Sequence, residues 1–140
     1  MIFANELPID CSGIIEASLD GKYEVIKSFV DKGCDLNNID ADGRTPLMSA
    51  IKNKHDKIAE LLIKSGALLD VQDHKGFTAL IHAAFSGSAD TAQLLVDRGA
   101  DINIKSNKGA VALFYAGMSK QQNIVRILRE AKRKAQDPNR

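Results

Sequence analysis

The fold is decided by residues 40–50, which read DADGRTPLMSA, because this stretch returns 33 positions later as DHKGFTALIHA in residues 73–83. Residues before and after the stretch keep the same step. The positions that share it are Gly33, Gly66 and Gly99; Ala17, Ala50, Ala83 and Ala116; and Ile14, Leu47, Leu80 and Leu113. Registers that hold one period across most of a chain indicate stacked structural repeats.

Each unit predicts two helices that follow a polar turn. Gly43 stands in the turn, where a positive φ is needed. Thr45 suits a helix N-cap and Pro46 suits the first helical position. We expect a second helix over about residues 55–64, with Gly66 after its end. The apolar positions are Leu47, Ala50 and Ile51 in the first helix, and Ile58, Ala59, Leu62 and Ile63 in the second.

The unit resembles the ankyrin repeat, whose pattern is Asp-x-x-Gly-x-Thr-Pro-Leu-His-x-Ala, then Leu-Leu, then Gly-Ala-Asp-x-Asn. The matching stretches include Thr45-Pro46-Leu47, Leu61-Leu62, Gly66-Ala67 and Gly99-Ala100-Asp101-Ile102-Asn103. The chain departs from the pattern at its His, where Met48, Ile81 and Phe114 stand. We therefore expect weakened polar contacts between repeats and a stack held mainly by aliphatic packing.

The resemblance implies an all-α repeat solenoid of ankyrin helix-turn-helix pairs joined by β-hairpin-like loops. We expect residues 1–140 to form a single domain, with four repeats at about 11–39, 40–72, 73–105 and 106–135 and a tail at 136–140. The terminal repeats are expected to act as caps, because Arg129 stands where earlier repeats place apolar residues. We also expect Ile2, Phe3 and Leu7 to fold back over the first helix.

Composition narrows the class of protein. A chain of 140 residues with 44% hydrophobic and 26% charged residues is not a disordered tail, and a net charge of +1 does not indicate nucleic-acid or membrane binding. No apolar run approaches the roughly 18–20 residues of a membrane span, and the N-terminus lacks the basic start of a secretory signal. Cys11 and Cys34 form no Cys-x-x-Cys pair, so we expect no disulfide framework and a cytoplasmic protein in a reducing compartment.

Few residues could carry catalytic chemistry. His55, His74 and His82 stand at different positions of the repeat, and none has a Cys or His partner at metal-ligand spacing. Cys34 replaces the alanine of the other repeats, which predicts a small buried side chain. We therefore expect no enzymatic activity, no metal, no cofactor and no small-molecule substrate.

The resemblance implies that a protein partner binds the concave face, through the hairpin tips and the exposed ends of the first helices. The predicted binding residues are Leu19, Arg44, Lys52, His74, Lys75, Phe77, Phe85, Lys105, Lys108 and Met118. Phe77 and Phe85 are the candidate anchors, since aromatic residues often carry binding energy at interfaces. The alternative is that each Phe folds back onto the neighbouring repeat.

Charge suggests the chemistry of the partner. The concave face carries a net +3, which indicates an acidic partner surface, or alternatively a solvated rim. A second basic block ends the chain, with a net +4 over residues 126–140. It indicates a last helix whose cations complement its own C-terminal dipole before it frays into a tail, or alternatively a docking site for an acidic partner, nucleic acid or membrane surface. The leading hypothesis is a monomeric protein–protein interaction module that acts as an inhibitor or scaffold. The alternative is nucleic-acid or anionic-surface binding through the basic C-terminal helix and the concave lysines, with no membrane span.

Overall fold

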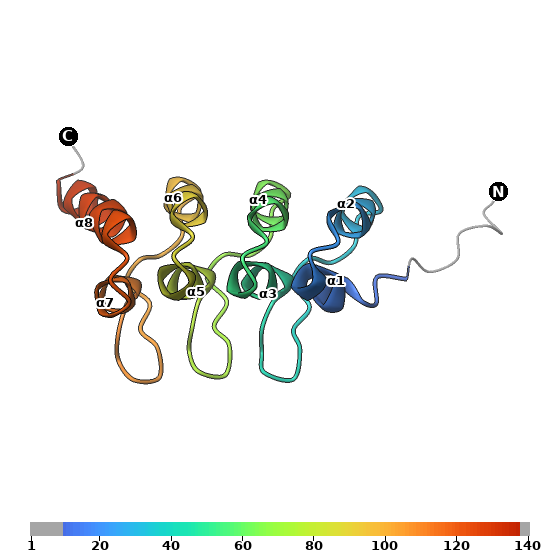
Figure 1. The fold of residues 1–140 in the computed structure, drawn as a ribbon, viewed down its shortest axis with the longest axis horizontal. Coiled ribbons are helices and arrows are strands. Elements are labelled where there is room, and N and C mark those ends of the chain that lie inside the picture. The colour runs from blue at the N-terminus through green and yellow to red at the C-terminus, as the bar shows by residue number, and fades with distance from the viewer. Residues whose placement is uncertain (1–9, 138–140) are drawn as a thin grey trace.

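The computed structural model describes residues 10–137, and within this range the regular structure is entirely helical. The helices are α1 (Ile14–Asp20), α2 (Tyr23–Asp31), α3 (Pro46–Lys52), α4 (Asp56–Lys64), α5 (Ala79–Ser86), α6 (Ala89–Asp97), α7 (Ala112–Met118) and α8 (Gln122–Gln136). Figure 1 shows four helix pairs in two rows, with α1, α3, α5 and α7 in the inner row and hairpin-like loops projecting from that row. The predicted all-α repeat solenoid is confirmed.

Capping residues explain where the inner helices begin. The Thr45 hydroxyl accepts the Met48 N–H at 3.2 Å, Pro46 follows at the first helical position, and Thr78 caps α5 in the same way. Val111 precedes α7 without a side-chain cap, yet its backbone (φ −96°, ψ 171°) matches that of Thr78 (φ −94°, ψ 171°). The repeat conformation therefore survives the loss of the capping hydroxyl.

The core runs along the stack between the two rows of helices. Every residue of α3 from Pro46 to Ile51 is buried, since α1, α4 and α5 all pack against it. Ala83, Ala84 and Ala92 are fully buried as well. Small side chains at these positions let neighbouring helices approach closely, while leucine and isoleucine fill the wider spaces between the rows.

Hydrogen bonds join neighbouring repeats at the hairpin tips, and the expectation that these contacts are weakened stays a prediction. The Asp42 carbonyl accepts the His74 N–H at 2.9 Å, and the Lys75 carbonyl accepts the Asn107 N–H at 3.0 Å, so each hairpin tip is joined to the next. Amide side chains add to these contacts, since Gln72 Nε2 donates to the Lys105 carbonyl at 2.9 Å. Main-chain and amide groups thus supply hydrogen bonds between the repeats although Met48, Ile81 and Phe114 replace the pattern's His.

A further junction lies between each inner helix and the outer helix of the next repeat. Gly21 and Gly87 adopt positive φ, and a Cβ at either would lie 2.6 Å from the His55 ring or 2.8 Å from the Gln121 amide. The equivalent positions Lys54 and Lys120 also have positive φ, at 61° and 58°. Glycine is therefore present at two positions of positive φ where a large side chain of the next repeat would have to move to admit a Cβ.

Cys11 and Cys34 form a disulfide, with Cα atoms 5.8 Å apart. The expectation of unpaired cysteines is wrong, and the predicted reducing compartment loses the argument that was drawn from it. Spacing could not show that the chain entering α1 passes the end of α2, where Cys34 lies. The burial predicted for Cys34 is confirmed, because the residue is only 8% exposed.

The repeat boundaries at 11–39, 40–72, 73–105 and 106–135 stay a prediction. Each of these ranges holds one helix pair, although α8 ends at Gln136, one position past the last range. The predicted contacts of Ile2, Phe3 and Leu7, and most of the predicted tail, lie outside the described residues.

Candidate functional site

We call the inner face the surface formed by α1, α3, α5 and α7 together with the hairpin loops that precede α3, α5 and α7. The structure gathers six of the ten predicted binding residues around one pocket on this face. The six are His74, Lys75, Phe77, Phe85, Lys108 and Met118. The pocket has a volume of about 770 Å³, and its other lining residues are Asn107, Gly109, Ala110, Phe114 and Tyr115. It lies between α5, α7 and their hairpins, and we call it the aromatic pocket.

The other four predicted residues lie on the inner face outside the pocket. Leu19 is half-buried at the end of α1, and its carbonyl accepts hydrogen bonds from Asn53 and His55 of the next repeat. Arg44 is paired with Asp42 at 3.5 Å, while Lys52 and Lys105 are exposed. Leu19, Lys52, Phe85 and Met118 share one register, and its exposed apolar residues are Phe85 and Met118, in the last two repeats.

Aromatic side chains from two repeats form the floor of the pocket. The rings of Phe77 and Phe85 stack with centroids 5.5 Å apart, and Tyr115 of the next repeat lies 5.2 Å from the first and 4.9 Å from the second. Phe77 is half-buried, whereas Phe85 keeps 39% of its surface exposed. The two residues therefore differ: Phe77 is folded against Tyr115 of the neighbouring repeat, while Phe85 contacts the same Tyr115 and also faces solvent.

Sequence reasoning missed Phe114 and Tyr115 as pocket residues. Phe114 shares its register with Met48 and Ile81, which are 1% and 0% exposed because a following repeat covers them. Phe114 is 57% exposed, since it belongs to the last repeat among the described residues. The sequence feature that could have indicated its exposure is its place in the last of the described repeats, where no following described repeat covers this register.

Two buried polar pairs hold the hairpins against the inner helices. His82 Nε2 lies 2.9 Å from Asp73 Oδ2, and the Tyr115 hydroxyl lies 2.7 Å from the Ser106 hydroxyl at the same register one repeat later. Burial lowers the pKa of His82 below its usual 6.5, although the hydrogen bond that the imidazole donates to the Asp73 carboxylate acts in the opposite direction. In the preceding repeat Ser49 takes the place of His82, and its hydroxyl is buried without a partner among residues 10–137.

The rim of the aromatic pocket is cationic. Lys75 and Lys108 are exposed on successive hairpin tips, and the eleven residues that line the pocket include no Asp or Glu. Asn107 ties these tips together, because its side chain donates to the His74 carbonyl at 2.8 Å and its N–H to the Lys75 carbonyl. The pocket therefore combines an apolar floor, a positive edge and a wall fixed by hydrogen bonds.

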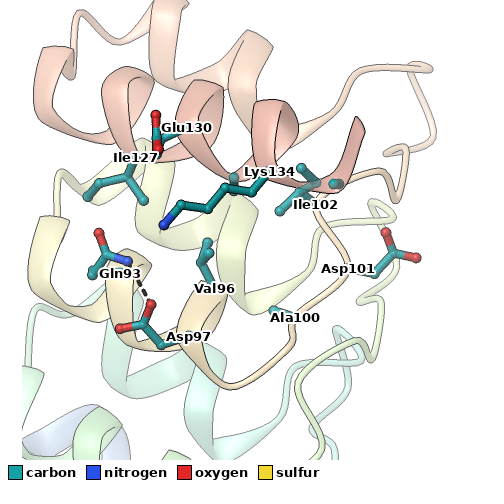
Figure 2. A pocket seen from close by; sticks show the side chains of 11 residues that line it. Gln93, Val96, Asp97, Ala100, Asp101, Ile102, Ile127, Glu130 and Lys134 are labelled. Atoms are coloured by element: carbon teal, nitrogen blue, oxygen red, sulfur yellow. Dashed lines mark hydrogen bonds between the residues drawn. The ribbon is translucent and has the colours of Figure 1, made fainter. Parts of the chain in front are cut away.

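A second pocket, of about 490 Å³, lies between α6 and α8 and holds none of the predicted binding residues. Figure 2 shows Lys134 extending along α8 into this pocket, and Gln93 of α6 donating a hydrogen bond to Asp97. Its lining includes Asp97, Asp101, Glu130 and Lys134 but no Ser, Thr, Cys or His.

The basic C-terminal helix forms a separate surface. Arg126, Arg129 and Arg133 of α8 line one shallow depression of about 300 Å³ together with Glu130, which pairs with Arg133. Arg140, the last residue of the predicted basic block, lies outside the described residues. The three arginines thus share one side of α8, away from the aromatic pocket.

Residues 10–137 contain no group of three His, Cys, Asp or Glu side chains that could hold a metal ion. Over the same residues, none of the helices combines the length and apolarity that crossing a membrane requires.

Comparison with known proteins supports the repeat pattern. The model of the family described as "Ankyrin repeats (3 copies)" matches residues 14–106 and 69–140. An ankyrin repeat domain-containing protein, oryK, of Aspergillus oryzae is 35% identical over 54 residues, which are 39% of this chain and 9% of the relative. The transient receptor potential cation channel subfamily A member 1 of Homo sapiens is 38% identical over 56 residues, 40% of this chain and 5% of the relative. The chain thus matches less than a tenth of the length of either curated relative.

Proposed function

Because the chain belongs to the ankyrin-repeat family, whose members are generally protein–protein interaction modules, we propose that it binds a protein partner through its inner face. The observation that supports this face is the exposure of Phe85 and Met118, at 39% and 54%, beside the lysines of the hairpin tips. Large apolar side chains exposed among cations are typical of an interface before its partner is bound.

The hairpin tips and helix ends of the predicted site carry a net charge of +3, from Arg44, Lys52, Lys75, Lys105 and Lys108 against Asp20 and Asp42. We propose that this charge favours a partner with an acidic surface and that the chain acts as an inhibitor or a scaffold. We propose a monomeric, non-enzymatic protein, in keeping with a family that is typically non-enzymatic. The cytoplasmic location stays a prediction without the support of free thiols, because Cys11 and Cys34 are bonded to each other.

Site-specific photocrosslinking in the native host tests the proposed face. A photoreactive phenylalanine analogue replaces Lys52 or Lys75 on the inner face, and Lys57 on α4 or Lys132 on α8 as matched exposed controls. We expect crosslinked protein adducts from the inner positions alone. Adducts that arise equally from the control positions, or only from them, would overturn the assignment of the face.

The alternative function is binding of nucleic acid or an anionic surface through the basic C-terminal helix and the inner-face lysines. The observation that favours it is the placement of Arg126, Arg129 and Arg133 on one side of α8. Such binding would weaken steeply with salt. A gel shift with labelled single-stranded and double-stranded oligonucleotides, and sedimentation with phosphatidylserine vesicles, would show binding at low salt that is lost in the Arg126→Ala/Arg129→Ala variant. Absence of binding to both probes would exclude this function.

A further inference from the structure

We propose that the aromatic pocket accepts the apolar side chain of an acidic, extended peptide segment, so that the partner is recognised by an apolar residue flanked by Asp or Glu. This inference rests on the proposed protein-binding function and gives the chemistry of the segment bound at one end of the inner face. It follows from the apolar floor, the cationic rim and the fixed geometry of the pocket.

The floor requires an apolar ligand. Phe85 is 39% exposed, Phe114 57% and Met118 54%, and all three line the same pocket of about 770 Å³. The hydroxyl of Tyr115, which also lines it, is already bonded to Ser106 at 2.7 Å. An aliphatic or aromatic side chain placed here would cover exposed apolar surface without leaving that hydroxyl unpaired.

The rim determines the charge of the segment that carries this side chain. Lys75 and Lys108 are exposed on adjacent hairpin tips, and no carboxylate belongs to the lining of the pocket. Lys52, exposed on the inner face one repeat earlier, adds a further positive charge, whereas Arg44 is paired with Asp42. Carboxylates on either side of the apolar residue would complement this edge, whereas a basic segment would be repelled.

The pocket is built before any partner arrives. Asn107 bonds to the carbonyls of both His74 and Lys75, which holds the two hairpin tips at a fixed separation. The pair Asp73–His82 holds the hairpin before α5 and the pair Ser106–Tyr115 the one before α7. Binding to such a site does not have to order the walls, which favours recognition of a short segment.

A peptide display experiment tests the inference. The full chain is immobilised with its disulfide intact, and a library of random peptides is selected on it at low salt. We expect the enriched peptides to share one Leu, Ile, Met or Phe with Asp or Glu at neighbouring positions. No enrichment, or enrichment of basic or uncharged peptides, would overturn the inference.

Variants of exposed residues then locate the peptide. An enriched peptide, made synthetically with a fluorescent label, is titrated by fluorescence polarisation against Lys75→Glu/Lys108→Glu and against Phe114→Ser/Met118→Ser. We expect a loss of affinity of about tenfold or more in each. The matched controls are Lys57→Glu on α4 and Leu68→Ser, whose residue is 58% exposed outside the pocket, and both are expected to bind as the wild type does. Circular dichroism melts check that every variant is folded.

The outcomes separate this inference from the proposed function. A peptide whose binding responds to Lys52→Glu but not to the pocket variants would overturn the pocket while leaving the inner face as the binding surface. If photocrosslinking in the native host gives no adducts from the inner-face positions, the proposed function is overturned even if peptides bind the pocket. A labelled single-stranded oligonucleotide that binds the wild type and is lost in Phe114→Ser/Met118→Ser would overturn the peptide in favour of nucleic acid.

Discussion

His82 and Asp73 join an inner helix to the hairpin of its own repeat, with His82 Nε2 2.9 Å from Asp73 Oδ2 and both side chains buried. The other carboxylate oxygen of Asp73 accepts the N–H groups of Lys75 and Phe77, so one side chain holds the turn and the helix together. Phe77 is also an edge-on neighbour of the His82 ring, with centroids 5.5 Å apart. This pair therefore supports the floor of the aromatic pocket.

The first prediction concerns the pH dependence of stability. Burial lowers the pKa of His82 in the folded protein, with Arg44 and Lys52 acting in the same direction and Asp73 opposing them. As pH falls, the imidazole of His82 takes up a proton in the unfolded protein before it does so in the folded protein. The contribution of His82 to the free energy of unfolding is therefore fully present above the ordinary pKa of 6.5 and decreases below it. Urea unfolding between about pH 7.5 and about pH 5 measures this decrease.

The variant His82→Gln isolates the contribution of the imidazole, because the amide can still donate to Asp73 but does not titrate. We expect its free energy of unfolding to change less over the same pH range than that of the wild type. An equal change in both proteins would assign the pH dependence to other groups.

The second prediction concerns the disulfide. Cys34→Ala places the residue found at the equivalent positions Ala67 and Ala100, so packing is preserved while the bond to Cys11 is lost. Closure of a loop with a sequence separation of 23 predicts a loss of about 3 kcal/mol in the free energy of unfolding. Denaturant unfolding with and without a reductant measures it. Reductant should destabilise the wild type and leave Cys34→Ala unchanged, and a wild type insensitive to reductant would contradict the prediction.

The third prediction concerns the junction between Gly87 and Gln121. Gly87→Ala places a Cβ at positive φ and 2.8 Å from the Gln121 amide, so we expect a loss of about 1–3 kcal/mol in the free energy of unfolding. Adding Gln121→Ser places at this position the residue that Ser88 supplies in the preceding repeat. The double variant should recover the share of the lost free energy of unfolding that the close contact causes. A double-mutant cycle measures this coupling, and strictly additive effects would show that the contact costs nothing.

The fourth prediction concerns two buried serines. Ser18 donates to the Ile14 carbonyl at 2.8 Å, whereas the Ser49 hydroxyl has no partner among the described residues. We expect Ser49→Ala to raise the free energy of unfolding by up to about 1 kcal/mol, because it removes a buried polar group that is not bonded. Ser18→Ala is the matched control and should bring no gain. Thermal melts of both variants decide between these outcomes.

The period predicted the helices and their caps, because Thr45 and Pro46 act locally and their effect can be read from neighbours in the chain. The aromatic pocket was predicted in part. Phe77, Phe85 and Met118 stood out at exposed registers, but Phe114 occupies a register that is buried in earlier repeats. Its exposure depends on the absence of a following repeat among the described residues, which is a property of the whole stack.

Contacts between distant segments could not be predicted from the sequence either, because they too depend on the whole stack. Cys11 and Cys34 bond because the chain before α1 passes the end of α2, and spacing carries no information about that path. The bond between Asn107 and the His74 carbonyl likewise joins the tips of two hairpins. Each depends on the geometry of stacking rather than on a pattern within one repeat.

The junctions at Gly21 and Gly87 imply that the repeats of this chain are not interchangeable. Gly21 precedes the bulky His55 and Gly87 precedes Gln121, while Lys54 stands one repeat before Ser88, the smallest residue in that register. Exchanging the second and third repeats would bring the Cβ of Lys54 against the amide end of Gln121, which would have to move. Neighbouring units are thus matched to one another at this junction, even though every unit has the same fold.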